Sequence, residues 1–237
     1  MKKNKAIGSI SSYLKALKII PLEENMVRFY RGHSELKWKL DPSLFRKQNK
    51  IFYEKELEIL KELHIHYPDS FSDSRNLFED LVIAQHYGVP TRLLDVTTNP
   101  LVALYFAVSV KKPKTGNAIV YIIDICKDSI VYYDNSEMLD SLKNSIEHIT
   151  PVKKYPIVGV KARLNNPRII RQQGAFLYFS EFNNNQDVIK DTFKIEISKS
   201  HIAQIKVDLS TLGISTQTLF PELTEFSKGI HNGEIKL

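Results

Sequence analysis

Residues 118–125, with the sequence AIVYIIDI, constrain the fold more than any other segment. The run is almost unbroken in apolar and mostly β-branched side chains, which predicts a strand in the middle of a sheet. Shorter β-type runs at residues 27–32, 175–180 and 192–197 predict further strands. The chain is therefore expected to form a sheet around the strand at 118–125.

Helical patterns accompany these strands. Helices are predicted, from apolar spacing and cap residues, at residues 11–20, 54–64, 77–86 and 100–110. Gly88 and Pro90 mark the end of the third helix, and Asn99 followed by Pro100 marks the start of the fourth. Residues 132–166 are irregular, contain prolines and show no clear pattern. The combination predicts the α+β class.

Length and composition favour one compact domain. The chain has 237 residues, of which 43% are hydrophobic and 25% are charged, and these are ordinary values for a globular protein. A chain of this size buries about 70% of the surface that it exposes when unfolded. No repeat or low-complexity linker divides the sequence. We therefore expect a single domain at residues 26–237, preceded by an N-terminal helical extension at residues 1–25.

No segment predicts a membrane anchor or a secretion signal. The apolar runs fall well short of the ~20 residues that span a bilayer, and the basic N-terminus lacks a small-residue cleavage site. Cys126 is the single cysteine, so no internal disulfide can form, which fits a reducing compartment. We expect a cytoplasmic protein without a membrane partner, in which the Cys126 thiol is mostly buried and unreactive.

The charge balance is basic, with 33 Lys and Arg against 27 Asp and Glu and a net charge of +6. This balance permits an anionic ligand or partner, such as a nucleic acid or a dinucleotide, without identifying one. The sequence contains no zinc-knuckle spacing, phosphate-binding glycine loop or dinucleotide fingerprint. His64 and His66 are spaced like metal ligands, but no third ligand lies near them, so we expect no metal.

Residues 85–108, QHYGVPTRLLDVTTNPLVALYFAV, crowd polar and charged groups between two predicted helices. Arg92 and Asp95 are three positions apart, and we expect them to form a structural clasp, defined as an ion pair buried within the loop. Removing one partner of a buried pair is strongly destabilising. The clasp would hold His86, Thr97 and Asn99 rigidly toward Arg31. In the open alternative, Asp95 is itself a binding or catalytic carboxylate.

Four segments carry a family resemblance. They are FYRGHSELKWKLDPSLFR (29–46), QHYGVPTRLLDVTTNPLVALYFA (85–107), NPRIIRQQGAF (166–176) and GISTQTLFPEL (213–223). In this order and spacing they resemble the FRG domain, over nearly the whole chain. Where that family usually has Trp after the LLD motif, this chain has Val96. The resemblance assigns a family and leaves the biochemical function open.

A second resemblance carries chemistry. FYRG is similar to the first-strand motif of ADP-ribosyltransferases, in which an Arg-Gly pair ends a strand and the Arg binds NAD. TTNPLVALYFA (97–107) is similar to their second motif. Their third motif supplies a catalytic Glu, and RQQGAF (171–176) occupies that place with Gln172 and Gln173 instead. The resemblance implies a split mixed β-sheet with flanking helices, of the ADP-ribosyltransferase-like type.

The resemblance and the local chemistry together assign candidate roles. The expected catalytic residues are Arg31, His86, Gln173 and Glu222. The expected NAD-binding residues are Tyr30, Arg31, Gly32, Tyr87, Thr97, Thr98, Asn99 and Gln172. An Arg contacts phosphate or an amide oxygen through two hydrogen bonds, and a carboxylate best stabilises the positive charge that develops when nicotinamide leaves ribose. Because a Gln does this poorly, the acid is expected to be Asp95, Glu181 or Glu222.

We expect one cleft lined by residues from the ends of predicted strands and helices. These residues are Arg31, His86, Thr97, Asn99 and Gln173. Structural alternatives remain open for most of them. Arg31 could form a strand-end salt bridge, His86 could hydrogen-bond the last carbonyls of its helix, and Thr97 and Asn99 could cap the next helix.

Two classes of function fit these patterns. The first is an ADP-ribosyltransferase-like enzyme, acting as a bacterial toxin or phage-defence effector, with NAD as cofactor and a nucleic acid or protein as acceptor. The second is a non-catalytic module that binds a nucleotide-like ligand or nucleic acid on a degenerate transferase fold. The missing Glu of the third motif favours the second class. The Arg-Gly pair and the polar cluster favour the first.

Overall fold

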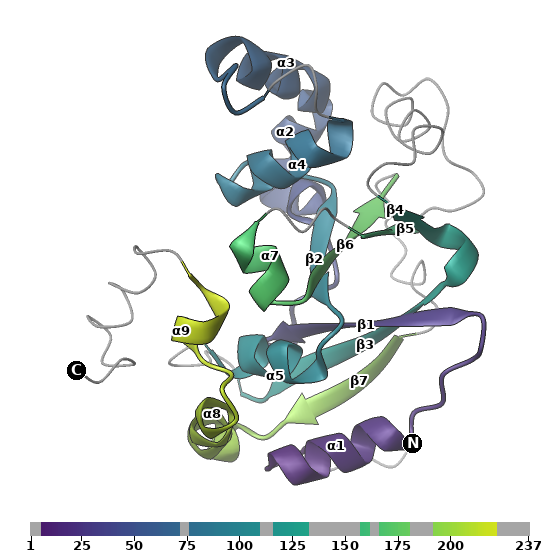
Figure 1. Ribbon diagram of the computed structural model, residues 1–237, viewed down its shortest axis with the longest axis vertical. Coiled ribbons are helices and arrows are strands. Elements are labelled where there is room, and N and C mark those ends of the chain that lie inside the picture. Colours follow the sequence, from purple (N-terminus) through teal and green to yellow (C-terminus); the bar gives the residue numbers. More distant parts are fainter. Residues whose placement is uncertain are drawn as a thin grey trace.

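The fold is built around a mixed β-sheet. A computed structural model describes residues 6–71, 76–109, 116–132, 157–161, 166–180 and 192–221. Within these ranges the sheet has the strand order β4-β5-β6-β2-β1-β3-β7 (Figure 1). The strands are β1 (Met26–His33), β2 (Leu93–Thr97), β3 (Ala118–Cys126), β4 (Ile130–Tyr132), β5 (Ile157–Lys161), β6 (Gly174–Phe179) and β7 (Thr192–Ile197). Among these seven strands, β4 and β5 are parallel neighbours and the other neighbouring pairs are antiparallel.

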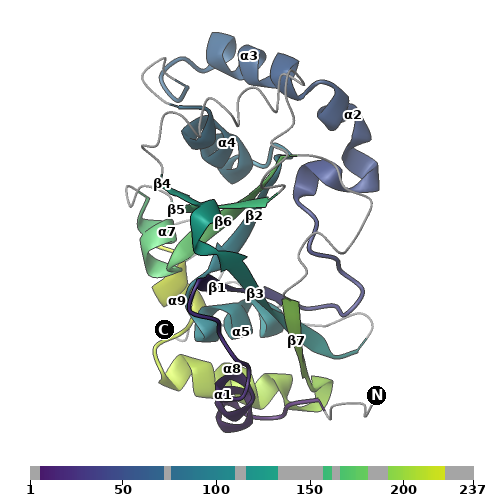
Figure 2. The same cartoon turned by 90° about the vertical axis from the view of Figure 1, so that its right-hand side faces the viewer.

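The helices gather at two ends of the molecule. They are α1 (Ile10–Lys18), α2 (Lys50–Glu54), α3 (Glu56–His66), α4 (Leu77–His86), α5 (Pro100–Val108), α7 (Pro167–Arg171), α8 (Ile202–Thr211) and α9 (Thr216–Leu219). Figure 2 shows α2, α3 and α4 at one end and α1, α5 and α8 at the other, with the sheet between them. The predicted α+β class is therefore confirmed.

The strand β3 confirms the strongest sequence prediction. Every residue of 118–125 is buried, and β3 pairs with β1 on one side and with β7 on the other. The other predicted strands and the four predicted helices are present with ends within two residues of those expected. These elements were predictable because their apolar periods and cap residues are patterns of a few neighbouring residues.

The sequence analysis did not predict α7, the short helix that ends just before Gln172 and Gln173. The helix begins with Asn166 as N-cap and Pro167 at its first turn, which is the same signal that starts α5 at Asn99. A helix of five residues is too short to show an apolar period. The two glutamines form the turn between α7 and β6, and Gln173 adopts a φ of 45°.

Apolar residues on both faces of the sheet form the core. On one face, α1, α5 and α8 pack against β3 and β7, while α3 and α4 pack against β5 and β6. The segment around Leu44 and Phe45 covers the opposite face. Within the predicted N-terminal extension, α1 joins the first of these clusters, because Tyr13 is fully buried and its hydroxyl donates to the main-chain oxygen of Pro100 at 3.0 Å.

The sheet is split between β1 and β2. These two strands share a single residue pair, Tyr30 with Thr97, whereas β1 and β3 are paired at eight positions. In Figure 1, β1, β3 and β7 run crosswise to β2 and β6. Beyond this single pair β1 and β2 diverge. From Arg31 onward, the edge of β1 that faces β2 is therefore unpaired.

Gly32, the glycine of the Arg-Gly pair, lets α5 approach β1. A Cβ at this position would lie 1.9 Å from the main-chain oxygen of Ala103 and 2.5 Å from the main-chain nitrogen of Ala107. Both atoms belong to the backbone of α5, which cannot rotate away as a side chain would. Gly32 was expected to bind NAD, and the structure gives it a packing role.

Replacing Gly32 with alanine is expected to destabilise the protein by about 1–3 kcal/mol or more, because the added methyl group overpacks the contact between β1 and α5. Gly174→Ala is a matched control, since a Cβ on this strand glycine would meet Ile169 at an ordinary 3.5 Å. Urea denaturation of both variants measures the free energy of unfolding. Equal stability of the two variants would contradict the backbone contact.

Candidate functional site

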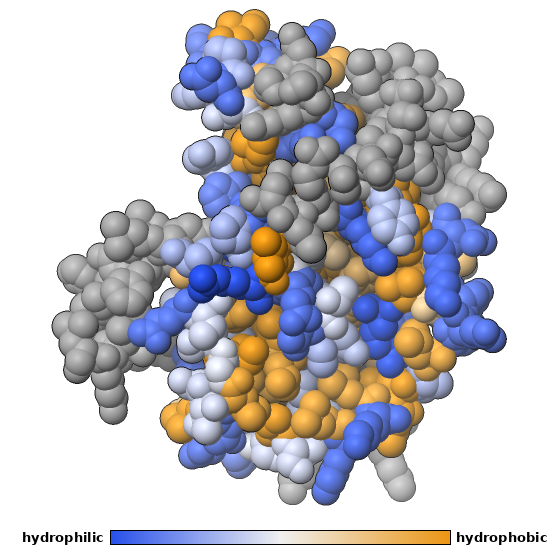
Figure 3. Space-filling view, in the orientation of Figure 1, coloured by the Kyte–Doolittle hydropathy of each residue, from blue (hydrophilic) through white to orange (hydrophobic). Residues whose placement is uncertain are grey.

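A cleft of about 420 Å³ opens at the split between β1 and β2. Its polar side chains are Arg31, Ser34, Gln85, His86, Asp95, Thr97, Asn166, Arg168 and Gln172, and its aromatic side chains are Tyr30, Trp38, Phe106 and Phe176. Figure 3 shows hydrophilic and hydrophobic residues side by side on this face of the molecule, around the position of α7. Polar groups that converge among apolar and aromatic side chains are typical of a ligand site.

Arg31 lies at the open edge of β1 and is fixed by two hydrogen bonds. Its Nε donates to Nε2 of His33 at 2.8 Å, and its Nη1 donates across the gap to the main-chain oxygen of Asp95. Removal from water lowers the pKa of Arg31, and the charge of Asp95 opposes this shift. Among the described residues, no hydrogen-bond acceptor is found for Nη2, while 20% of the side chain is exposed. The guanidinium is therefore held in place with donors left for a ligand.

His33 is the buried partner that orients Arg31. Burial, followed by the charge of Arg31, lowers the pKa of His33 from 6.5 to about 4, so the imidazole is neutral at pH 7. Because Nε2 accepts from Arg31, the ring proton is placed on Nδ1, which lies 3.3 Å from the main-chain oxygen of Trp38. The imidazole of His33 therefore contacts both the guanidinium of Arg31 and the backbone of Trp38.

Asp95 presents a carboxylate that is exposed but oriented. Its side chain is 63% exposed, and Oδ2 lies 3.8 Å from Nη1 of Arg31. Its Oδ1 accepts from Nε2 of Gln85 at 2.7 Å. Oε1 of Gln85 accepts in turn from the hydroxyl of Thr91, which is buried. This chain of hydrogen bonds from the interior holds one carboxylate oxygen and leaves the other at the cleft.

The predicted clasp between Arg92 and Asp95 is wrong. Arg92 is fully buried and donates from Nε to Oε1 of Glu56 at 2.8 Å and from Nη1 to the main-chain oxygen of Ser180 at 2.7 Å. Side chains alternate between the two faces of an extended strand, so residues three positions apart point to opposite faces. Arg92 points toward α3, and Asp95 points toward the cleft.

The α7 side of the cleft carries a second guanidinium. Arg168 lies over the ring of Phe220, with 4.8 Å between the guanidinium carbon and the ring centroid. In the described part of the chain this guanidinium has no hydrogen-bond acceptor. Nearby, Nε2 of Gln172 donates to the main-chain oxygen of Leu219 at 3.2 Å. The segment at the end of α9 thus positions two cleft residues without itself lining the cleft.

His86 and Tyr87 end α4 and differ in their relation to the cleft. Both residues are exposed, but His86 lines the cleft and Tyr87 does not. The two rings contact each other edge to face at 5.4 Å between centroids. The alternative in which His86 bonds the last carbonyls of the helix is not observed among the described contacts.

The residues after β2 close a turn with the end of α7. The Thr97 hydroxyl donates to the main-chain oxygen of Gln172 at 2.7 Å, and the Thr98 amide donates to that of Gln173 at 3.0 Å. Oδ1 of Asn99 accepts from the first turn of α5, which confirms the capping alternative for Asn99. Of these residues, Thr97 and Gln172 line the cleft, and Thr98, Asn99 and Gln173 do not.

The structure thus brings a part of the predicted set together. The predicted residues that line the cleft are Tyr30, Arg31, Gly32, His86, Asp95, Thr97 and Gln172. Glu181 and Glu222, two of the three carboxylates considered as the acid, lie outside the described residues. Asp95 is the remaining one, and it lines the cleft.

The site also depends on residues that the sequence analysis did not single out, among them His33, Trp38, Gln85 and Arg168. Three of these four line the cleft, and His33 supports Arg31 from behind. A signal was present for Trp38, since it is the single tryptophan of the chain and stands among lysines in ELKWKL. Gln85 shows no such local signal, because its partner Asp95 lies in another element.

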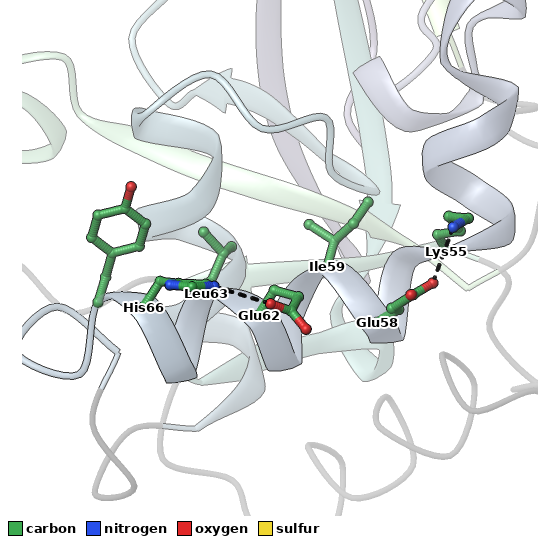
Figure 4. A pocket seen from close by; sticks show the side chains of 7 residues that line it. Lys55, Glu58, Ile59, Glu62, Leu63 and His66 are labelled. Atoms are coloured by element: carbon green, nitrogen blue, oxygen red, sulfur yellow. Dashed lines mark ion pairs between the residues drawn. The ribbon is translucent and has the colours of Figure 1, made fainter.

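A second hollow, of about 300 Å³, runs along α3 (Figure 4). Lys55 pairs with Glu58 at 3.4 Å and Glu62 pairs with His66 at 3.2 Å, and all four side chains are more than half exposed. Exposed pairs of this kind contribute little to stability. The residues that line this hollow come from α3 and from the two ends of that helix, and no polar groups of other elements converge on it. We therefore place the candidate site in the cleft.

Neither a metal site nor a membrane-spanning helix is found among the described residues. Among the described residues, no group of three His, Cys, Asp or Glu side chains is placed to hold a metal ion. His64 instead bonds Oδ2 of Asp80 at 2.9 Å. Over the same ranges, every helix is too short or too polar to cross a membrane. Cys126 has an intermediate exposure.

Comparisons with known proteins identify one family. No curated protein and no solved structure matches the chain. Residues 27–116 match the family model of the FRG domain. The matched range contains Arg31, Gln85 and Asp95, and the α7 side of the cleft lies beyond it. Residues 27–116 are therefore identified as an FRG domain.

Proposed function

We propose that the cleft binds NAD and that the chain is an ADP-ribosyltransferase-like enzyme. The observation that carries this proposal is the guanidinium of Arg31, which is fixed at the cleft with unpaired donors beside an oriented carboxylate, Asp95, at 3.8 Å. The guanidinium offers a contact for a phosphate or an amide oxygen. The carboxylate offers stabilisation for a developing positive charge.

Size and charge support a nucleotide as the ligand. The cleft volume of about 420 Å³ lies in the ~300–1,000 Å³ range of small-molecule sites. Arg31 and Arg168 face a single described carboxylate in the cleft, Asp95, so the charge balance favours an anion. Two guanidinium groups suit the two phosphates of a dinucleotide, because each binds phosphate in a planar, two-bond geometry.

The proposed reaction breaks the bond between nicotinamide and ribose. The electron pair of that carbon–nitrogen bond leaves with nicotinamide, and the ribose carbon gains positive character that the Asp95 carboxylate stabilises. A hydroxyl or amine of the acceptor then forms a bond to this carbon and loses a proton. His86, which is exposed at the cleft and has no hydrogen bond to a described residue, accepts that proton.

Arg168→Gln is expected to weaken NAD binding by about 10-fold or more, because a hydrogen bond to a charged group is worth roughly 1.5–3 kcal/mol. Calorimetric titration with NAD measures this affinity. Arg171→Gln is the matched control, since Arg171 is exposed on the same helix and does not line the cleft. Arg168 is preferred to Arg31 for this test, because Arg31 also bonds His33 and Asp95 and its loss would disturb the fold.

Asp95→Asn separates binding from chemistry. The proposal expects NAD to bind this variant while release of nicotinamide is lost, because an amide cannot stabilise the developing positive charge. If the parent binds NAD and releases no nicotinamide, the chain is a non-catalytic nucleotide-binding module. If calorimetry detects no binding of NAD to the parent protein, the proposal is overturned.

A further inference from the structure

Trp38 is an exposed aromatic ring on the cleft, at the side of Arg31. Its residue surface is 48% exposed, although it is the single tryptophan of the chain and lines the cleft. Large aromatic side chains are buried on average, because they carry much apolar surface. The exposure of this ring therefore needs an explanation.

The backbone of Trp38 is fixed even though its ring is open. Its main-chain oxygen accepts from the hydroxyl of Tyr121 at 2.9 Å and lies 3.3 Å from Nδ1 of His33. Both partners are buried. The indole is thus attached to a fixed backbone. Less conformational entropy of the protein is therefore lost when a ligand binds.

His33 also sets the spacing between the indole and Arg31. The imidazole lies 6.0 Å from the indole, centroid to centroid, at an interplanar angle of 70°. The same imidazole accepts from Nε of Arg31 at 2.8 Å. An open aromatic face and a guanidinium with unpaired donors therefore lie on two sides of one buried ring.

We propose that Trp38 stacks a heteroaromatic base, so that the cleft selects nucleotides over sugar phosphates and inorganic phosphates. A nucleotide joins a planar base to a phosphate through one ribose, which matches an open ring beside an anion-binding guanidinium. The proposal rests on the proposed function, because it assumes that Arg31 contacts the phosphate. It adds the recognition of the base to the recognition of the phosphate.

The test compares ligands with and without a base. Trp38→Leu should weaken the binding of NAD by about 5- to 150-fold, the range that loss of one base stack gives. The same substitution should leave the affinity for pyrophosphate unchanged, and Trp38→Phe should restore most of the affinity for NAD. Titration calorimetry measures the affinities, and thermal melting checks that each variant is folded.

The tryptophan itself gives an independent readout. Because the chain has one tryptophan, its fluorescence reports on this ring alone. NAD and AMP should quench the emission, and pyrophosphate and ribose 5-phosphate should not. Tyr132→Leu is a control, since Tyr132 is an exposed aromatic residue on β4 and does not line the cleft. That variant should keep the quenching.

Each outcome decides between the two proposals. If NAD binds the parent and Trp38→Leu leaves its affinity unchanged, base stacking on Trp38 is refuted and the proposed function stands. Equal losses of affinity for NAD and pyrophosphate would refute the stack as well, since Trp38 would then shape the anion site. If neither NAD nor pyrophosphate binds the parent, both proposals fall.

Discussion

Glu56→Ala is expected to destabilise the protein by about 3–5 kcal/mol, because it leaves the charge of Arg92 buried and unpaired. Arg92 is fully buried and bonds Glu56 through both Nε and Nη2. The rings of Phe45 and Tyr178 lie 5.9 and 5.6 Å from its guanidinium carbon. Burial lowers the pKa of Arg92, but the hydrogen bonds and charge of Glu56 outweigh burial and raise it overall. The arginine therefore stays charged, and no water can replace its partner.

Chemical denaturation of the parent and the variant measures this loss, with Asp95→Ala as the matched control. The Asp95 carboxylate is 63% exposed, and an exposed ion pair contributes about 0–1 kcal/mol. Asp95→Ala should therefore remain close to the parent in stability. A variant Glu56→Ala that unfolds at the same urea concentration as Asp95→Ala would show that the Arg92 site admits water.

The stability of the protein is expected to fall by about 3 kcal/mol between pH 6.5 and pH 4 because of His33, since one pKa unit corresponds to ~1.4 kcal/mol. The folded protein lowers the pKa of His33 from 6.5 to about 4. Below pH 6.5 the unfolded chain binds a proton at this histidine and the folded protein does not. Acid therefore favours unfolding until the folded state also takes up the proton near pH 4, below which the contribution of His33 is constant.

His33→Gln isolates this contribution from that of the other titrating groups. A glutamine oxygen can still accept from Arg31 but does not titrate. Free energies of unfolding for the parent and the variant, measured at several pH values from 7 to 4, should converge as the pH falls. Parallel curves over this range would show that His33 is not held neutral in the folded protein.

The two predictions concern contacts that the sequence indicates to different degrees. His33 directly follows the Arg-Gly pair, and alternation along β1 puts its side chain on the same face as that of Arg31, two positions earlier. The hydrogen bond between them thus follows from local geometry once the strand is known. Its burial, which lowers the pKa, depends on Tyr121 of β3 and on how the segment after β1 folds Trp38 back onto the ring.

The sequence by itself determined the elements whose signals are local. The apolar run of β3, the N-cap Asn99 and the end of α4 before Gly88 were all predicted, because apolar period and cap chemistry act over a few residues. Arg31 and Thr97 reach one cleft for a related reason, since both stand near strand ends that meet where the sheet splits.

The tertiary structure alone decided which partners the charged and aromatic groups would have. The sequence suggested Asp95 as the partner of Arg92 because they are close along the chain, but the alternation of the strand separates them. Glu56, which is 36 positions away, meets Arg92 only because α3 packs over the end of β2. The same holds for Gln85 beside Asp95 and for the exposure of Trp38. Burial and partner choice depend on how distant elements pack, and no local pattern encodes that packing.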